Sequence, residues 1–325
     1  MLFINGAAMR QAVTLSQVMD RVEDAYRLFV SGDFDMPERP VFQNGEDTIL
    51  YMPCFAKEVI STKFLTLFPG NPAKGLPYIS GLMLLNGRAD GQTLAVMDAG
   101  TLTALRTGAV GGVGMRCFAP AGAHRAGLIG CGTQGFHQLL YACDARDIQE
   151  IWLLDSQPGK DYDGFINRLR QELGERAPAF HVAEDSRQLA ANSDIVITAT
   201  QAAAPVLPDD PELLRGRCFV AIGSYKPGMR ELPDAIWQLV PEVVTELPFA
   251  LEESGDLSQP LAAGLLTEER VKYIGDLLTQ GRPEPPAPGA TTYFKSVGMG
   301  LLDLCVAKYI YEQALALGLG QKVEM

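Results

Sequence analysis

Hydrophobic positions change their spacing within the first hundred residues, which separates one helix from a series of strands. Over residues 15–30 the apolar side chains recur three and four positions apart, as on one face of a helix, and Gly32 follows as a stop signal. Beyond it, apolar and polar residues alternate between turn signals, and Asn44-Gly45 is a favoured hairpin turn. We therefore expect one helix and an antiparallel sheet with strands at residues 41–42, 48–52, 60–68, 79–85 and 93–97.

Residues 98–118 combine helical spacing with an unusual number of glycines. Leu102, Leu105 and Ala109 give the segment an apolar face, and Pro120 ends it. Glycine lowers helix stability by roughly 1 kcal/mol relative to alanine. The second half of this helix nevertheless has glycine at positions 108, 111, 112 and 114. The pattern predicts that another backbone or a ligand approaches this helix closely.

After residue 120, short apolar strands alternate with helical segments. Helices are predicted near residues 136–143, 161–175 and 186–192. The strands are expected within residues 126–135 and at residues 150–154, 179–183, 194–200, 218–223 and 242–247. Strands that alternate with helices imply a parallel, doubly wound sheet, in which ligands bind at the carboxyl ends of the strands.

The C-terminal part begins with a proline-rich loop at residues 281–290. Residues 292–317 are predicted to form a strand or turn and then a long helix, which Gly318 or Gly320 would end. Between residues 297 and 307 this helix is apolar on nearly every side. We expect it to be buried between two modules of the chain or between subunits.

The stretch Ala126 to Gly135 carries the strongest chemical signal of the chain. Its apolar first half suits a buried strand, and its second half has glycine at positions 130, 132 and 135, with Thr133 and Gln134 between the last two. A strand that enters a helix through Gly130, Gly132 and Gly135 is suited to a dinucleotide, because backbone N–H groups at the helix start face the pyrophosphate. We therefore predict a doubly wound, Rossmann-type nucleotide-binding domain.

A second strand supports this prediction and indicates the cofactor. It ends in Asp155, twenty residues after Gly135, where an acid would bind the adenosine ribose hydroxyls. Asp155 would repel a 2′-phosphate and no arginine follows at residues 156–158, so NAD(H) is favoured while NADP(H) remains possible. Other candidate cofactor contacts lie at predicted strand ends, at Thr198, Ala199, Thr200, Gly223 and Ser224.

Composition excludes several classes of partner. The chain has 325 residues, enough for two domains, and a net charge of −12, which argues against nucleic acids and anionic membranes. This charge does not exclude a small anionic substrate, because a few local cations dominate a buried pocket. No apolar run reaches the length of a membrane span and the N-terminus lacks a signal-peptide pattern.

Cysteine and histidine usage adds the expected compartment and argues against a metal site. The six cysteines lack paired short spacing, which indicates reduced thiols and a cytoplasmic protein. The three histidines, at positions 124, 137 and 181, form no ligand pattern with cysteine or acid. We therefore expect no bound metal.

Five segments together resemble the ornithine cyclodeaminase/μ-crystallin family, and the likeness extends over almost the whole chain. The specific ones are Leu102-Thr103-Ala104-Leu105-Arg106-Thr107-Gly108-Ala109 and Phe294-Lys295-Ser296-Val297-Gly298. The others are the glycine turn at residues 130–135 and the segments 223–232 and 253–257. The resemblance implies a homodimer with a dimerisation and substrate domain at residues 1–118 and 300–325, and a nicotinamide-binding domain at residues 119–299. Members include ornithine cyclodeaminase, an alanine dehydrogenase, ketimine reductases and a hormone-binding crystallin.

The same resemblance assigns roles to four residues. It implies that Arg39, Lys63 and Arg106 bind the carboxylate of a small amino or imino acid, and that Thr107 contacts the cofactor phosphates. The residues fit this role, because Lys63 interrupts an apolar strand, where a cation is costly unless it is paired. Ordinary salt-bridged or solvated side chains remain the alternative for all three cations. Lys295 and Ser296 are expected to border the cofactor or substrate pocket, although a structural ion pair is equally compatible with Lys295.

One departure from the family pattern separates the possible activities. Cyclodeaminases carry an acid two positions before the proline of the segment 223–227, and this chain has Tyr225 there. A phenol, with a reference pKa of about 10, is a poor base near neutral pH, so we expect Tyr225 to line the substrate pocket. Asp256 or Glu231 remains a possible substitute.

Tyr225 favours an oxidoreductase that reduces a cyclic imino acid with a nicotinamide cofactor, such as Δ1-pyrroline-2-carboxylate to L-proline. Lys63 would also relay a proton to the imine nitrogen. The alternatives are ornithine cyclodeamination, alanine oxidation, and ligand binding without turnover.

Overall fold

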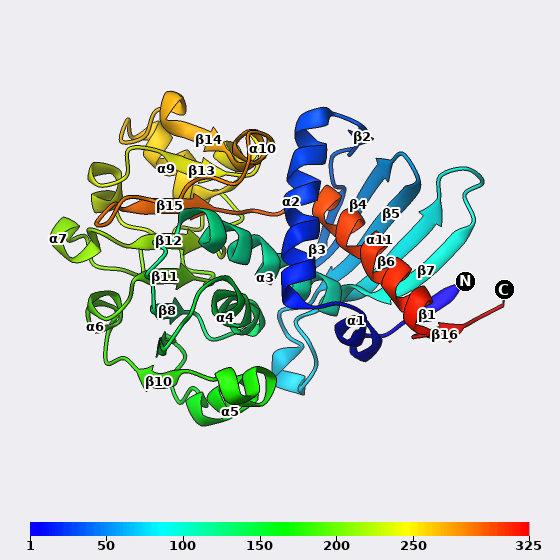
Figure 1. Cartoon of the computed structure of the whole chain (residues 1–325), viewed down its shortest axis with the longest axis horizontal. Helices are drawn as coiled ribbons and strands as arrows, with labels where there is room; N and C mark the ends of the chain where they lie inside the picture. The colour runs from blue at the N-terminus through cyan, green and yellow to red at the C-terminus, as the bar shows by residue number, and fades with distance from the viewer. Residues whose placement is uncertain (325) are drawn as a thin grey trace. The chain divides into compact units, whose positions relative to one another are not determined.

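The computed structural model describes residues 1–324, apart from the side chain of Pro72, and these residues form two units. Unit 1 comprises residues 1–106 and the C-terminal segment from residue 299, and unit 2 comprises residues 107–298. The first boundary falls inside helix α3 (Ala99–Phe118), whereas the sequence led us to expect it at the end of that helix, after residue 118. The second boundary differs from the expected one by a single residue. Figure 1 shows the elements of each unit.

Unit 1 contains the sheet that was predicted from the alternating pattern. Its strand order is β16-β1-β7-β6-β5-β4-β2, and β3 pairs with β4. The hairpin turn at Asn44-Gly45 is confirmed, since Asn44 pairs with Asp47 and Gly45 has φ of 63°. The strands are β1 (Leu2–Ile4), β2 (Phe34–Asp35), β3 (Val41–Asn44), β4 (Asp47–Ala56), β5 (Val59–Leu67), β6 (Ile79–Gly87), β7 (Thr93–Asp98) and β16 (Gln321–Lys322). The sequence missed β1, β2 and β16, because two or three residues are too few to show a period.

Three helices complete unit 1, namely α1 (Gly6–Ala12), α2 (Leu15–Ser31) and α11 (Gly300–Leu317). Helix α2 begins with a capping box between Thr14 and Gln17 and ends at Gly32 in the left-handed conformation, as predicted. Helix α11 packs against α2 and against β4, β5 and β6, on one face of the sheet (Figure 1). The apolar segment expected to be buried is therefore part of the core of unit 1.

Unit 2 is a parallel eight-stranded sheet with the order β10-β9-β8-β11-β12-β15-β13-β14. The chain passes from β8 to β9 on one side and later to β11 on the other, so the carboxyl end of β8 is the topological switch point. The doubly wound Rossmann-type fold is confirmed, and the segment after residue 291 is a strand. The strands are β8 (Arg125–Ile129), β9 (Glu150–Leu154), β10 (Ala179–Val182), β11 (Ile195–Thr198), β12 (Cys218–Ala221), β13 (Val243–Thr245), β14 (Val271–Tyr273) and β15 (Thr292–Lys295).

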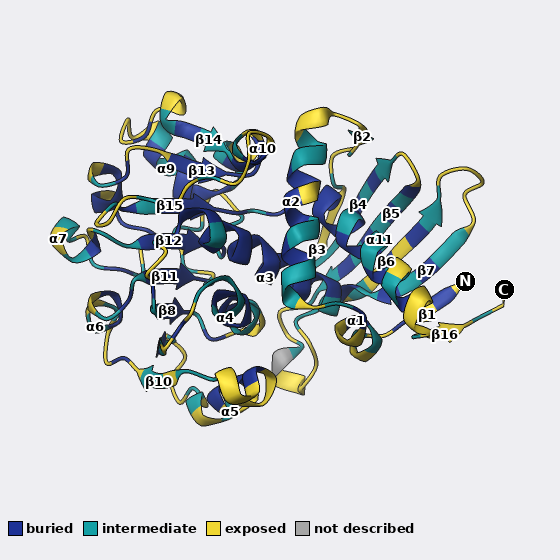
Figure 2. Cartoon of the chain, viewed as in Figure 1, coloured by how far each residue is buried: buried dark blue, intermediate teal, exposed yellow. Residues whose placement is uncertain are grey.

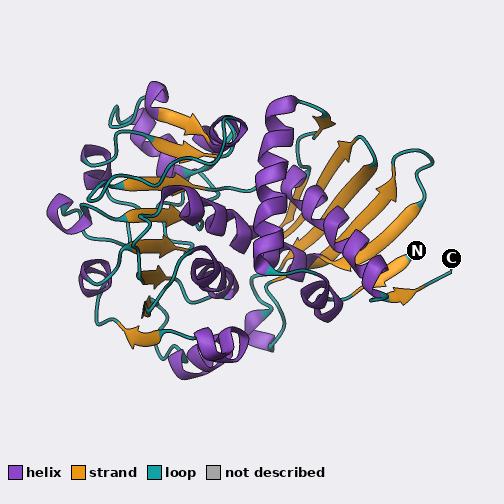
Figure 3. Ribbon diagram, viewed as in Figure 1, coloured by secondary structure: helices purple, strands orange, loops and turns teal. Residues whose placement is uncertain are grey.

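Helices lie among these strands, and the two middle strands, β11 and β12, are buried throughout (Figures 2 and 3). The α-helices of this unit, besides the end of α3, are α4 (Thr133–Ala145), α5 (Tyr162–Leu173), α6 (Ser186–Ala191), α7 (Pro211–Leu214), α8 (Ala250–Glu253), α9 (Gly255–Ala262) and α10 (Ile274–Thr279). Short 3₁₀ turns of this unit are η2 (Gly174–Arg176), η3 (Asp234–Gln238) and η4 (Glu268–Arg270), while η1 (Pro72–Lys74) lies in unit 1. No helix among residues 1–324 has the length and apolar character of a membrane span.

Close packing within unit 2 explains three of the glycines in the second half of α3, at positions 108, 111 and 114. A Cβ at Gly111 would lie 1.7 Å from Oε1 of Gln138, whose Nε2 donates a hydrogen bond to the Thr107 carbonyl at 2.7 Å. Cβ atoms at positions 108 and 114 would meet the rings of Tyr141 and Phe294 at 2.5 and 2.3 Å. The predicted close approach is therefore confirmed, and the approaching groups are side chains of α4 and β15.

Candidate active site

The glycine turn after β8 has the backbone geometry that the sequence indicated. Gly130 has φ of 101°, a conformation that side-chain-bearing residues rarely adopt. A Cβ at Gly135 would lie 2.1 Å from the Gly130 carbonyl oxygen, whereas a Cβ at Gly132 would meet nothing within 4 Å. Helix α4 starts at Thr133 without a side-chain cap on its first N–H groups. This combination fits a pyrophosphate at the helix N-terminus.

Asp155 follows β9 and contacts the same turn. Its Oδ2 accepts a hydrogen bond from the Cys131 amide at 2.7 Å, and its Oδ1 accepts one from the Gln157 amide at 2.9 Å. Lys160 donates to the Cys131 carbonyl at 2.6 Å, and its Nζ lies 3.6 Å from Asp155 Oδ2. The expected ribose-binding acid therefore has a cation, Lys160, beside it. The sequence did not indicate this cation, because Lys160 lies beyond residues 156–158, where an arginine was expected for NADP(H).

A hollow of about 480 Å³ opens next to this acid and cation. Lys160 and Arg168 provide its positive charges and Asp161 provides a negative one. It is lined by Gln157, Lys160, Asp161, Gly164, Phe165 and Arg168, from the loop after β9 and the first turns of α5. The loop after the second strand of such a sheet is where the adenosine end of a dinucleotide binds.

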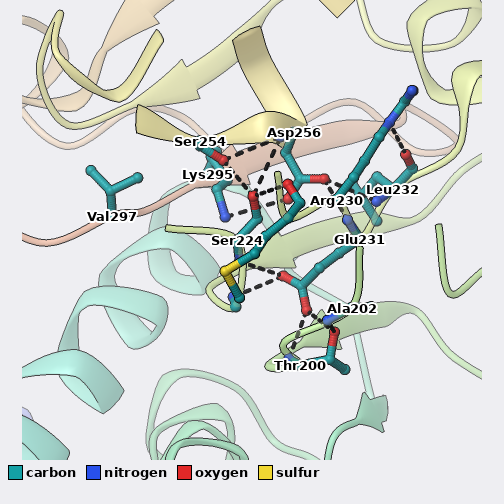
Figure 4. Close-up of polar contacts among 12 residues, drawn as sticks. Thr200, Ala202, Ser224, Arg230, Glu231, Leu232, Ser254, Asp256, Lys295 and Val297 are labelled. Atoms are coloured by element: carbon teal, nitrogen blue, oxygen red, sulfur yellow. Dashed lines mark hydrogen bonds and ion pairs between the residues drawn. The ribbon is translucent and has the colours of Figure 1, made fainter. Parts of the chain in front are cut away.

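The ends of β11 and β12 are tied together by Glu231, as Figure 4 shows. Its Oε1 accepts hydrogen bonds from the amide and the hydroxyl of Thr200, both at 2.7 Å. Its Oε2 accepts from the amides of Gly223 at 2.7 Å and Ser224 at 3.2 Å. The expected cofactor contacts Thr200, Gly223 and Ser224 are thus held at adjacent strand ends by one buried carboxylate.

A second buried acid holds Glu231 in place. Asp256 Oδ1 accepts hydrogen bonds from the amides of Glu231 at 2.7 Å and Leu232 at 3.1 Å (Figure 4). Its Oδ2 lies 3.4 Å from Nζ of Lys295, and both side chains are fully buried. Burial raises the pKa of Glu231, and the neighbouring Lys295 opposes this rise while Asp256 adds to it. Lys295 therefore forms a buried ion pair at the end of β15, one of the two alternatives left open for it.

These contacts bear on the proton donor. Glu231 uses both oxygens to accept hydrogen bonds, and Asp256 uses one oxygen for two amides and directs the other toward Lys295. Both acids therefore have structural partners among the described residues. Tyr225 lies half-buried after β12, with the Lys226 ammonium 5.7 Å from its ring centroid.

The remaining candidates of unit 2 differ in exposure. At the glycine turn, Thr133 is exposed and Gln134 is partly exposed, so both are accessible to a ligand. Thr198 and Ser296 are almost fully buried, and the amides of Ala199 and Ser296 donate to the carbonyls of Ile129 and Ala221. The side chain of Thr107 is likewise buried. The side chains of the glycine turn are therefore more accessible to a cofactor than those at the ends of β11 and β15.

Unit 1 brings the predicted cations around a residue that the sequence reading missed. Asp303, on α11, accepts a hydrogen bond from Nζ of Lys63 at 2.6 Å through Oδ2. Its Oδ1 accepts one from Nε of Arg106 at 2.9 Å. Lys63 is fully buried, Asp303 almost so, and Arg106 is 8% exposed. Asp303 could have been found from the sequence, because it is an acid within the apolar segment 297–307 and buried carboxylates usually have partners.

Arg39 adds a third positive charge to this cluster. Burial lowers the pKa of Arg39, and the positive charge of Arg106 lowers it further while Asp303 opposes both effects. Burial lowers the pKa of Lys63 from 10.5 to about 8, with Asp303 opposing and Arg106 and Arg39 adding to the shift. Lys63 and Arg106 share one carboxylate, and the charge of Arg39 acts on the same place, so the site suits a second carboxylate. The hydrogen bonds to Asp303 use one donor each of Lys63 and Arg106, and these groups have three and five.

The described residues contain no group of three histidine, cysteine or acidic side chains arranged to hold a metal ion. His124 and His181 instead lie near single surface acids, Asp147 and Glu150.

Known proteins that are similar to this chain include Δ1-pyrroline-2-carboxylate reductases and an alanine dehydrogenase. A Δ1-pyrroline-2-carboxylate reductase of Bacillus cereus is 32% identical, with the alignment covering 100% of both proteins. The solved structure of Thermococcus litoralis Δ1-pyrroline-2-carboxylate reductase in complex with NADH and L-proline superposes with a TM-score of 0.90 at 30% identity, over 99% of this chain and 100% of that one. An archaeal alanine dehydrogenase dimer with bound NAD gives a TM-score of 0.87 at 28% identity, over 100% and 99%. Residues 3–318 match the model of the ornithine cyclodeaminase/mu-crystallin family, and the chain therefore belongs to that family.

Proposed function

We propose that the protein reduces a cyclic imino acid with a nicotinamide cofactor, with Δ1-pyrroline-2-carboxylate to L-proline as the leading reaction. The observation that carries this proposal is the cluster in which the buried cations Lys63 and Arg106 share the Asp303 carboxylate, with Arg39 close enough to affect the charge of Lys63. A similar protein of the same length was solved with NADH and L-proline, a ligand whose carboxylate such a cluster would bind.

The residues of unit 2 fit a dinucleotide. The uncapped start of α4 and the open side of Gly132 suit the pyrophosphate, and Asp155 suits the adenosine ribose. NAD(H) is the favoured cofactor, because Asp155 opposes a 2′-phosphate. Lys160 partly offsets that negative charge, so NADP(H) remains a usable second cofactor. When bound, the reduced nicotinamide supplies a hydride to the imine carbon.

The residues of unit 1 would perform the other tasks. Arg106, with a planar set of donors, suits bidentate binding of a carboxylate, and Lys63 and Arg39 add charge. The Lys63 ammonium, with a pKa of about 8, is also matched to proton donation near neutral pH. A proton on the imine nitrogen makes the imine carbon more electrophilic. Fixing the substrate in one orientation contributes a further part of the rate, up to about 7–11 kcal/mol in well-aligned reactions.

Assays with an imino acid, ornithine and L-alanine, together with cofactor binding, test this function. Loss of NADH absorbance with pyrroline-2-carboxylate, and no ammonia release from ornithine, is the expected result. Ammonia release from ornithine at constant NADH would instead identify a cyclodeaminase. Reduction of NAD⁺ by L-alanine would identify an alanine dehydrogenase, and cofactor binding without turnover would identify a binding protein.

We also propose a homodimer formed through the sheet of unit 1. Four large apolar side chains are exposed on the face of the sheet opposite α2 and α11, namely those of Phe42, Tyr51, Leu82 and Leu84. The ring centroids of Tyr51 and Phe64 lie 5.2 Å apart. A contiguous apolar face of this kind is typical of a subunit interface, and one similar structure is a dimer. Sedimentation should give twice the chain mass, and Leu82→Glu should give monomers. A wild-type monomer at micromolar concentration would contradict this proposal.

A further inference from the structure

Asp303 is a buried acid on a helix that is otherwise part of the apolar core of unit 1. Its neighbours along α11, Leu302 and Leu304, are buried hydrophobic residues. Burying a carboxylate with two cations is expensive, and apolar residues of similar volume in such a place are often as stabilising or more so. The ion cluster is therefore a costly way to build a core, which points to a purpose other than packing.

The geometry of the cluster shows what Asp303 does to its partners. One oxygen binds Nζ of Lys63 at 2.6 Å and the other binds Nε of Arg106 at 2.9 Å. One carboxylate thus fixes the rotamers of two cations that come from β5 and α3. Because Nε lies on one edge of the guanidinium, its terminal nitrogens keep donors that can bind another group.

Building on the proposed function, we propose that Asp303 is the positioning residue of this reaction. It orients Lys63 and Arg106 toward the substrate carboxylate, and it keeps Lys63 protonated so that Lys63 serves as the proton donor to the imine nitrogen.

The charges around Lys63 explain why this residue needs a counter-ion. On β5 it is flanked by Met52 of β4 and Met83 of β6, which carry no charge. Arg106 from α3 and Arg39 from the segment before β3 disfavour its protonated form, as does burial. Asp303 from α11 opposes all three.

Two further groups act on this region from β4 and α11. The thiols of Cys54 and Cys305 have pKa values raised to about 12 by burial, so both are neutral over the working range. Besides Asp303, the carboxylate of Asp35 also raises the pKa of Cys54. Asp303 is therefore the acid in direct contact with Lys63.

The proton step balances as follows. An N–H bond of the Lys63 ammonium breaks, and the proton bonds to the imine nitrogen through its lone pair. The substrate then accepts the hydride at carbon, and the π electrons of the carbon–nitrogen bond become the lone pair of the amine. Lys63 is left neutral and regains its proton from solvent, and the Asp303 carboxylate favours that return.

The direct test is a titration of Lys63 without any ligand. Protein labelled with ¹³C-lysine is followed by NMR against pH, and the Lys63 signal is assigned with Lys63→Arg. Removing an adjacent opposite charge typically shifts a pKa by one to three units. We expect Lys63 of Asp303→Asn to titrate at least one unit below Lys63 of the wild type. An unchanged titration would overturn the proposal, whatever the activity.

The second test connects this charge to the reaction. The basic limb of the kcat/KM profile with the imino acid should move to lower pH in Asp303→Asn by the same amount. Activity should then be at least about fivefold lower at pH 8 and recover at pH 6. Merely structural damage would lower activity at every pH without moving the limb, and that result would overturn the proposal. Glu312→Gln, on an exposed part of α11, is the matched control and should leave both profiles unchanged.

Two safeguards keep the test decisive. If Asp303→Asn does not fold, Asp303→Glu replaces it, because it keeps the charge and moves it by one methylene. This variant should keep the basic limb of the wild-type pH profile and have a lower kcat. A shift of that limb in Asp303→Glu would count against the proposal. If the wild type reduces no imino acid, the proposed function fails, while the NMR titration still decides whether Asp303 holds the Lys63 proton.

Discussion

Asp155 and Lys160 bind opposite ends of one residue in the glycine turn. The Asp155 carboxylate accepts from the Cys131 amide at 2.7 Å, and the Lys160 ammonium donates to the Cys131 carbonyl at 2.6 Å. The two charged groups lie 3.6 Å apart and are both largely buried. A negative and a positive group therefore meet at the proposed ribose site, and both charges would act on a 2′-phosphate bound there.

The first prediction concerns this pair and the choice of cofactor. Asp155→Ser removes the carboxylate, so the KM for NADH should rise by about 10- to 100-fold, the equivalent of about 1.5–3 kcal/mol for hydrogen bonds to a charged group. The KM for NADPH should fall or stay constant, because the repulsion is removed. Lys160→Met should have the opposite effect on the ratio. Steady-state kinetics with both cofactors measures this, and an unchanged ratio in both variants would contradict the assignment of Asp155 to the ribose.

The second prediction separates two glycines of the same turn. Gly135→Ala places a Cβ 2.1 Å from the Gly130 carbonyl oxygen, so it should lower the Tm substantially. Gly132→Ala meets nothing within 4 Å, so its Tm should match that of the wild type. Its Cβ nevertheless lies on the open side of the turn, and the Kd for NADH, measured by fluorescence, should increase at least tenfold. Equal Tm losses in both variants would contradict this distinction.

The third prediction concerns the effect of Lys63 on stability. The pKa of Lys63 is about 8 in the folded chain and 10.5 as its ordinary value. Between these two pH values the unfolded chain holds the proton and the folded chain does not, so the contribution of Lys63 to the free energy of unfolding increases as pH rises from 8 to 10.5. Urea unfolding of wild type and Lys63→Met at pH 7.5 and 10 measures this. The wild type should gain stability relative to the variant at pH 10, and a relative loss would show that the lysine keeps its proton.

The fourth prediction tests the carboxylate site of unit 1. Arg106→Lys keeps the charge but loses the planar set of donors, so the KM for the imino acid should rise about tenfold or more. The KM for NADH should change little, because the cofactor residues lie in unit 2. Arg168→Lys, at the rim of the hollow in unit 2, is the control and should leave the KM for the imino acid unchanged. An unchanged KM in Arg106→Lys would contradict the role of Arg106 in binding the substrate carboxylate.

The fifth prediction concerns Glu231. Glu231→Gln puts an NH₂ group among four donors, so at least one of them loses its acceptor. Leaving a buried donor unsatisfied costs about 1–3 kcal/mol, and thermal unfolding should show a loss of this size. Glu172→Gln, on the exposed side of α5, is the control and should be neutral. A neutral Glu231→Gln would mean that the strand ends do not depend on this carboxylate.

Much of the architecture could be predicted from local patterns. The capping box at Thr14 and the glycine turn are read from neighbouring residues, because both depend on backbone geometry over a few positions. The strands β4, β5 and β6 were found for the same reason, since their side chains alternate between a buried and an open face. Elements such as α7, α8 and β14 were missed, because three or four residues do not complete a period.

The sequence by itself determined the cations at positions 39, 63 and 106, the glycine turn and the acid at position 155, because each lies in a short segment with its own signature. Only the tertiary structure decided that Asp303 binds two of those cations and that Glu231 and Asp256 accept hydrogen bonds from backbone amides of unit 2. The physical reason is distance along the chain. Asp303 is 240 residues from Lys63, and the charge state of a buried group depends on whichever groups the fold places against it.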